Sequence, residues 1–306
     1  MRIESLPSSN RQTQGVQRRE WLHLHSPQHL QQCEEIMQRA LQSRAPGASR
    51  STAILGAGAC TEVPLATLAR YSDEVVLVDF DNEAMRLAGN ELVWPALRKK
   101  ISLVHCDLSG DVSARLARII SRYDWQRLAQ QGAAALFDAA AGCLEQCPVP
   151  DPPQIGGLVA GEFGLVISSL ILSQLFSYPL LDMLDQIERV SPQMVSEQER
   201  QRRYQEAAQQ FRIRIINAHL HLLRTLLDQG GMAVLISDTH GFVFKAHSAE
   251  GEPQQRRTIP LVPRIFSELV HNVFTVVDEL HWEWITDLPQ QDRPGRGYHV
   301  AGFLLQ

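Results

Sequence analysis

From residue 51 onward, short apolar runs bounded by turn residues alternate with amphipathic segments. Runs of this kind, rich in β-branched residues and only weakly alternating, are typical of parallel strands that helices cover on both faces. Helical patterns fall between them, and this repeated order predicts an α/β fold with a doubly wound sheet and right-handed crossovers. The runs that predict strands are 51–58, 74–81, 101–108, 162–169 and 231–238.

Two connections between these runs are longer than a simple crossover needs. Residues 109–161 join the third and fourth runs, and residues 175–230 join the fourth and fifth. Both contain helical patterns, so we expect helical insertions beside the sheet, and the Gly230-Gly231 pair is typical of a helix C-cap. After residue 260, two β-like runs predict an antiparallel closing pair. The expected sheet is therefore mostly parallel and seven-stranded, with an antiparallel last strand.

The first fifty residues differ from the rest of the chain. Residues 1–19 show no hydrophobic periodicity, which predicts a loose tail. Residues 21–41 have helical spacing, with Ser26 in the place of an N-cap and Pro27 in the first turn. We therefore divide the chain into residues 1–50, a tail and helix that could serve as a lid or as the arm of a homodimer, and an α/β domain over residues 51–306.

Charge and hydropathy exclude several classes of protein. The chain has 29 Lys and Arg against 34 Asp and Glu, a net charge of −5, which argues against a nucleic-acid binder. No apolar stretch approaches the ~20 residues that span a bilayer, and the polar N-terminus does not resemble a secretory signal. Five scattered cysteines, an odd count, suit reduced thiols. The expected location is the cytoplasm, away from membranes.

The first predicted strand ends in a glycine-rich turn, Leu55-Gly56-Ala57-Gly58-Ala59-Cys60. Such a turn lets the backbone approach a ligand closely and points free N–H groups at it. The second strand ends at Asp79, 79 − 58 = 21 residues after Gly58, which matches the ~20-residue spacing of an acid that accepts from ribose hydroxyls. The third strand ends at Asp107, which could accept from an adenine amine or could instead cap the following helix.

These segments together resemble the class I S-adenosylmethionine-dependent methyltransferases, over about residues 51–306. The motifs that carry the resemblance are ILGAGACTEVPLATLAR, VVLVDFDNEAM, VHCDLSG, FGLVISSLILSQL and GGMAVLISD. The resemblance implies a Rossmann-like fold with S-adenosyl-L-methionine as cofactor and methyl transfer by in-line displacement. It says little about the methyl acceptor.

The resemblance also implies which residues bind the cofactor. The glycine turn would lie against the methionine portion, Asp79 would hold the ribose with Phe80 beside the adenine, and Asp107 would bind the adenine edge. Two serines at the end of the fourth strand would lie near the sulfonium. The cofactor-binding residues expected in this way are Gly56, Ala57, Gly58, Asp79, Phe80, Asp107, Leu108, Ser168 and Ser169.

The chain departs from the family's pattern at three points. Cys60 stands where many members have a third glycine, and Ser173-Gln174 stands where a common subset has two histidines. No Asn-Pro-Pro-Tyr run follows the fourth strand, which disfavours methylation of nucleobase amines. We therefore expect a small-molecule or peptide acceptor.

Candidates for a base that removes the acceptor's proton are His240, Asp238 and Tyr178. His240 follows the fifth run in an expected loop, where a solvated histidine is the more common case. Tyr178, just past the fourth strand, could close over a substrate or simply pack at a helix end. Cys143 and Cys147 have the spacing of half a metal site, but no second close pair accompanies them, so no metal site is predicted.

Two other functions share parts of this pattern. A nicotinamide-dependent oxidoreductase has the glycine turn and the second-strand acid, although it does not require the third-strand acid. A methyltransferase-like scaffold without catalysis would keep the core and lose the ligand.

Overall fold

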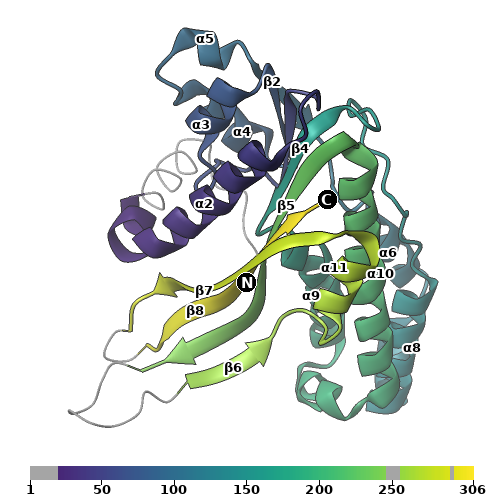
Figure 1. The fold of residues 1–306 in the computed structure, drawn as a ribbon. Coiled ribbons are helices and arrows are strands. Elements are labelled where there is room, and N and C mark those ends of the chain that lie inside the picture. The colour runs from purple at the N-terminus through teal and green to yellow at the C-terminus, as the bar shows by residue number, and fades with distance from the viewer. Residues whose placement is uncertain (1–19, 246–255, 290–292) are drawn as a thin grey trace.

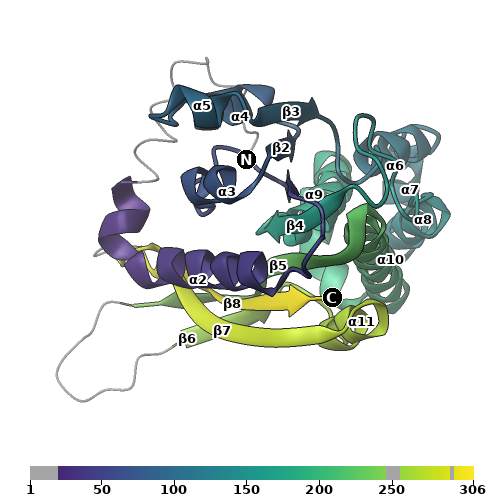
Figure 2. The same ribbon diagram turned by 45° about the horizontal axis from the view of Figure 1, so that its top comes forward.

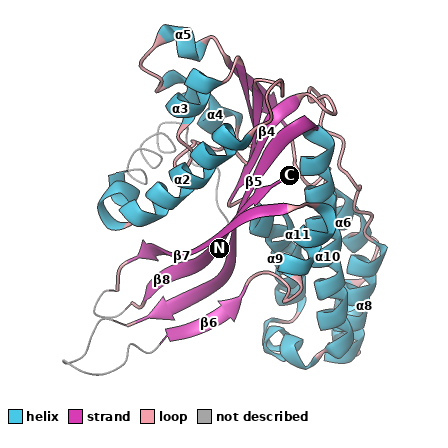
Figure 3. Ribbon diagram, viewed as in Figure 1, coloured by secondary structure: helices cyan, strands magenta, loops and turns pink. Residues whose placement is uncertain are grey.

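The computed structural model describes residues 20–245, 256–289 and 293–306, so the tail expected over residues 1–19 lies outside the described residues. One twisted sheet runs through the molecule, with helices on both of its faces (Figures 1 and 2). Figure 3 shows the same three layers by secondary structure, with strands extending beyond the helices at one end. The layered α/β architecture expected from the alternating runs is confirmed.

The sheet has the order β3-β2-β1-β4-β5-β8-β7. The five strands from β3 to β5 are parallel, and β8 lies antiparallel between β5 and β7. This is the doubly wound sheet of seven strands with an antiparallel last strand that the sequence predicts. An eighth strand, β6, pairs with the far end of β5 and was not predicted. The strands are β1 Ser51–Leu55, β2 Glu74–Asp79, β3 Ile101–His105, β4 Phe163–Ser169, β5 Leu227–Phe244, β6 Arg256–Pro260, β7 Val276–Asp287 and β8 Gly295–Leu305.

Helices from both halves of the chain form the two outer layers (Figure 1). One layer holds α2 Pro27–Ser43, α3 Leu65–Tyr71, α4 Asn82–Asn90 and α5 Pro95–Arg98. The other holds the helices of both long connections and the one before β7: α6 Val112–Ile120, α7 Trp125–Gln130, α8 Ala133–Gln146, α9 Leu172–Val190, η1 Pro192–Arg200, α10 Arg202–Leu226 and α11 Phe266–Val273.

Alternation along the inner strands divides the core into two apolar clusters, one on each face of the sheet. In β2, Val76 and Val78 belong to the cluster under α6–α11, whereas Val75 and Leu77 belong to the cluster under α2–α4. Because every position of β2 between its two ends is buried, the strand shows the continuous apolar run from which it was predicted.

The Gly230-Gly231 prediction is wrong. Helix α10 ends at Leu226 and β5 begins at Leu227, so both glycines lie inside the strand. Gly230 has φ +91°, and its carbonyl accepts a hydrogen bond from the Ala45 amide at 3.0 Å. The pairing of β4 with β5 shifts register between Phe163 and Leu165, which makes this end of the strand irregular. The pair therefore lies in the irregular stretch of β5 where the chain enters the sheet.

The N-terminal helical segment is fixed to the last strands of the sheet. Residues 20–25 are helical, and α2 follows after Ser26. The Ser26 hydroxyl does not cap α2 and instead donates to the Ile285 carbonyl at 2.6 Å. Further along, the Trp282 indole donates to His29 Nδ1 at 2.8 Å, and the His29 ring stacks on Trp284 with centroids 4.5 Å apart. Residues more than 250 positions apart in the chain are thereby held in contact.

Replacement of His29 by alanine tests this docking. His29 is 1 % exposed, and its removal leaves a buried cavity and a Trp282 indole without its acceptor. We expect His29→Ala to lower the free energy of unfolding by about 2–4 kcal/mol, measured by urea denaturation. Gln38→Ala, an exposed change on the same helix, serves as the control and should cost less than about 0.5 kcal/mol. Equal losses in the two variants would contradict the assigned role of His29.

Candidate functional site

Close packing determines the shape of the turn after β1. Gly56 has φ +72°, and a Cβ atom placed there would lie 2.5 Å from the Cβ of Ile171. Only glycine fits this combination of left-handed backbone and close contact. Gly58 is also left-handed, at φ +46°, but a Cβ there would meet only Asp79 Oδ2, 4.0 Å away. The turn is thus pressed against the loop that follows β4.

The amides of this turn are bonded within the protein, which corrects the expectation that they point freely at a ligand. Gly56 and Ala57 donate to the Val78 carbonyl at 2.9 and 3.2 Å, and Gly58 donates to Asp79 Oδ2 at 2.9 Å. The Cys60 amide donates to Ala57. The turn therefore offers a closely approachable backbone rather than a set of unused donors.

Cys60 adopts the backbone conformation that a glycine would favour. Its φ is +50° and its side chain is buried. A cysteine in the left-handed region is strained by roughly 1–2 kcal/mol. The burial of its thiol offsets part of that cost, so the turn keeps its shape without a third glycine.

Asp79 and Asp107 lie at the same edge of the sheet. Asp79 Oδ1 accepts from the Asp81 amide at 2.8 Å, while Oδ2 holds Gly58. Burial, together with the charges of Asp107 and Asp79, raises the pKa of the Cys106 thiol to about 11. Both carboxylates are therefore close to Cys106, as expected for acids at the carboxyl ends of neighbouring parallel strands.

The remaining residues of this edge have different exposures. The Phe80 ring is 74 % exposed and lies 5.6 Å from the His105 ring. Asp107 Oδ1 accepts from the amide and the hydroxyl of Ser109, but Asp107 does not cap the following helix α6, whose N-cap residue is Asp111. The side chain of Leu108 is buried in the apolar cluster beneath α6, and only its main chain remains for contact with a ligand.

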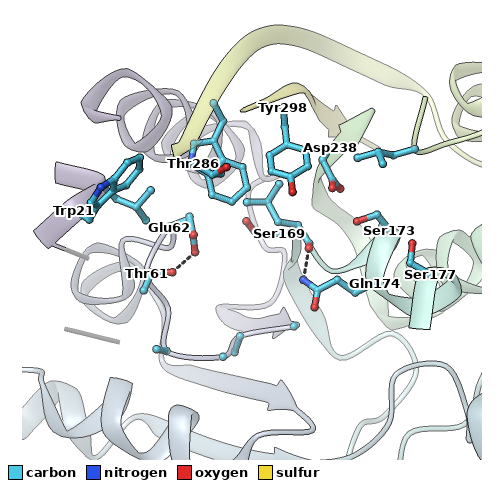
Figure 4. A pocket seen from close by; sticks show the side chains of 18 of the residues that line it. Trp21, Thr61, Glu62, Ser169, Ser173, Gln174, Ser177, Asp238, Thr286 and Tyr298 are labelled. Carbon is cyan, nitrogen blue, oxygen red and sulfur yellow. Dashed lines mark hydrogen bonds between the residues drawn. The ribbon is translucent and has the colours of Figure 1, made fainter. Parts of the chain in front are cut away.

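Beside the glycine turn lies a cavity of about 900 Å³ (Figure 4). Its walls come from the glycine turn, the start of α9 and the strands β5, β7 and β8, with Trp21 from the N-terminal helical segment. The predicted site residues that line it are Gly56, Ala57, Gly58, Ser169, Tyr178 and Asp238.

Ser168 lies away from this cavity. Side chains alternate along β4, so the adjacent Ser168 and Ser169 point to opposite faces of the sheet. Ser168 is fully buried, and its hydroxyl pairs with His219 Nε2 of α10 at 2.8 Å. Desolvation lowers the pKa of His219 to about 4, so its ring is neutral there. Ser169 is therefore the serine of this pair that reaches the cavity.

The prediction that His240 lies in a loop is wrong. Strand β5 continues to Phe244, and His240 lies within it, opposite His299 of β8. The two rings are 6.2 Å apart and line a second cavity of about 790 Å³ beside α11. His240 is thereby separated from Asp238 and Tyr178, the other two candidate bases, which line the first cavity.

Two polar atoms of the first cavity lack a partner in the described part of the chain. They are Ser169 Oγ, in a side chain only 9 % exposed, and Asp238 Oδ1. Burial raises the pKa of Asp238 to about 6, and a hydrogen bond from Ser173 partly opposes this shift. Buried polar groups are nearly always satisfied in folded proteins, so both atoms indicate a bound ligand or water.

Several lining residues were not predicted as site residues from the sequence. Ser173, Gln174 and Ser177 present a polar face at helical spacing at the start of α9. Such a polar stripe in an otherwise apolar helix directly after a strand is a signal that sequence analysis could have used. Trp284 and Tyr298 come from the closing strands, and no local sequence pattern shows that they reach this cavity.

Within the described ranges, no group of three or more His, Cys, Asp or Glu residues is arranged to hold a metal ion. Cys143 and Cys147 are both buried as free thiols. A search of the described helices for a bilayer-spanning segment finds none.

Comparison with known proteins gives structural similarities only. No protein-family model matches the chain, and no curated protein matches it. A SAM-dependent methyltransferase from Aquifex aeolicus is similar in structure at 9 % identity over 98 % of each chain, with a TM-score of 0.41. The glycopeptide N-methyltransferase MtfA is similar at 12 % identity over 87 % of this chain and 92 % of its own, with a TM-score of 0.37.

A third similar structure is precorrin 8W decarboxylase from Methanobacterium thermoautotrophicum, at 13 % identity over 89 % of each chain and a TM-score of 0.35. The strand order and the antiparallel strand β8, rather than these similarities, identify the fold. It is the Rossmann-like α/β fold with an antiparallel last strand that the sequence predicts.

The buried carboxylate of Asp238 predicts a pH-dependent stability. Its pKa is raised on folding from 3.8 to about 6, so the folded state holds the proton more tightly than the unfolded state. The resulting stability is fully present below pH ~4 and is lost as the pH rises through ~6. We expect Asp238→Asn, which cannot ionise, to gain on the order of 1–3 kcal/mol relative to wild type between pH 4 and pH 7.5.

Urea denaturation at the two pH values measures this gain. Asp73→Asn, at an exposed carboxylate that pairs with exposed Arg50, is the control and should show no comparable gain. A constant difference between Asp238→Asn and wild type at both pH values would show that Asp238 is not desolvated.

Proposed function

We propose that this chain transfers a methyl group from S-adenosyl-L-methionine to a small-molecule or peptide acceptor. The observation that carries the proposal is the 2.9 Å hydrogen bond from the Gly58 amide to the Asp79 carboxylate. This bond joins the glycine turn to the acid at the end of β2, directly beside a cavity of about 900 Å³. The site therefore combines a nucleoside-binding edge with space for a second molecule.

The residues at the edge fit an adenosyl group. Each oxygen of Asp79 accepts one amide, and an ionised carboxylate has about four acceptor positions, which leaves capacity for two ribose hydroxyls. The exposed Phe80 ring offers an apolar face for the adenine. We infer that the Asp107 carboxylate, whose charge acts on the same Cys106 thiol, accepts from the adenine amine.

The residues of the cavity fit the reacting end. The cofactor, when bound, supplies a methyl carbon made electrophilic by a sulfonium. The close backbone of Gly56 and Gly58 receives the methionine portion beside Ser169. Ser169 and Asp238, with unpartnered oxygens, orient the acceptor. Asp238, largely ionised at neutral pH, accepts the proton that the acceptor loses.

Ligand-induced stabilisation tests the proposal. S-adenosylhomocysteine at a hundredfold excess over its Kd should stabilise the chain by about 2.7 kcal/mol, measured by thermal denaturation. NAD and NADP should give no shift. A shift with a dinucleotide alone would support an oxidoreductase, and no shift with any of the three would support a non-catalytic scaffold.

Matched variants separate the binding edge from the fold. Phe80→Ala removes an exposed ring and should weaken S-adenosylhomocysteine binding without lowering the unliganded Tm. Asp79→Asn should also weaken binding while keeping an oxygen for the Gly58 amide. Val93→Ala, at another exposed apolar residue, is the control and should bind normally.

A further inference from the structure

The cavity carries negative charge on several of its walls. Glu62, Asp238 and Asp287 line it, and its described lining contains no Lys, Arg or His. Figure 4 shows Glu62 on the side of Trp21 and Asp238 on the side of Ser173, so these carboxylates come from different elements around a shared space. A ligand placed between them is in a negative potential, which favours a cation and disfavours an anion.

Aromatic rings form a second part of the lining. Trp284 of β7 and Tyr298 of β8 lie with ring centroids 5.4 Å apart, and Trp21 and Tyr178 line the same cavity. The face of an aromatic ring attracts ammonium groups, most strongly for tryptophan. These rings also provide apolar area for the body of a ligand.

The unpartnered atoms specify the kind of hydrogen bond that the ligand must make. Ser169 Oγ belongs to a side chain that is nine-tenths buried, and it has no partner among the described residues. Asp238 is less buried as a residue, but its Oδ1 atom is also buried and has no partner among the described residues. An ionised carboxylate only accepts hydrogen bonds, so the group that satisfies Asp238 must be a donor. An ammonium provides several N–H donors together with a positive charge.

We propose that the methyl acceptor is a primary or secondary amine that binds in its protonated form. Its N–H groups donate to Asp238 and Ser169, and its charge is balanced by the carboxylates of the cavity. Its apolar body lies against the aromatic rings. This inference rests on the proposed methyltransferase function and names the substrate class of the same site.

Methyl transfer to such an acceptor forms one C–N bond, breaks one C–S bond and releases one proton. The protonated amine loses one proton, which the Asp238 carboxylate accepts and passes to solvent. The nitrogen lone pair then forms a bond to the methyl carbon while the C–S bond breaks and its electron pair stays on sulfur. A methylated ammonium, S-adenosylhomocysteine and one released proton result.

Calorimetric titration of the full chain with three matched probes tests the acceptor class. The probes are 2-phenylethylamine, 2-phenylethanol and 3-phenylpropionate, which share a phenyl ring and differ in charge. Each is titrated with and without saturating S-adenosylhomocysteine. We expect the amine to bind at least about tenfold more tightly than the alcohol, and the carboxylate to bind most weakly.

Variants show which groups cause the preference. Asp238→Asn and Glu62→Gln should each reduce the advantage of the amine over the alcohol severalfold while S-adenosylhomocysteine still binds. Glu206→Gln, at an exposed residue of α10 paired with Arg202, is the matched control and should leave the preference unchanged.

The proposal is overturned if the alcohol or the carboxylate binds as tightly as the amine, or if none of the three binds at millimolar concentration. If the wild-type chain does not bind S-adenosylhomocysteine, the proposed function is contradicted. Normal S-adenosylhomocysteine binding without an amine preference would contradict the acceptor class alone.

Discussion

The hydrogen bond between the Gly58 amide and the Asp79 carboxylate joins the ends of β1 and β2, and much of the site depends on it. It fixes the glycine turn on one side, while the contact of Gly56 with Ile171 fixes it on the other. Because the turn's amides are bonded to Val78 and Asp79, its geometry is set before any ligand arrives. Asp79 therefore stabilises the turn and is also proposed to bind the ligand. Asp79→Asn is more informative than an alanine substitution because asparagine keeps an acceptor oxygen for the Gly58 amide.

The two apolar clusters explain how distant segments meet at one cavity. The cluster under α2–α4 contains Trp282 and Trp284 of β7 as well as the apolar face of α2. His29 lies against both tryptophans, so docking of α2 positions a ring that lines the cavity. The opposite cluster holds the start of α9, whose polar face supplies Ser173, the hydrogen-bond partner of Asp238. Burial on both faces of the sheet thus places the polar residues at its carboxyl edge.

Most of the fold could be predicted from the sequence because buried parallel strands leave continuous apolar runs, as in β2 and β4. The acids at the ends of β2 and β3 follow from the same pattern. His240 was misplaced because β5 continues past its apolar run, where pairing with β8 rather than hydrophobicity defines the strand. Both serines of β4 were assigned to the site although strand alternation allows only one of them to face it. The aromatic walls depend on contacts between the two ends of the chain, which no local pattern records.

The hydrogen bonds of Ser26 to Ile285 and of Trp282 to His29 have a consequence for the order of folding. Because synthesis proceeds from the N-terminus, α2 must wait for nearly the whole polypeptide to emerge before it can dock on β7. Contacts of such large sequence separation form slowly. The inner parallel strands can assemble earlier, so in a nascent chain the turn after β1 would meet Asp79 before the cavity next to them is complete.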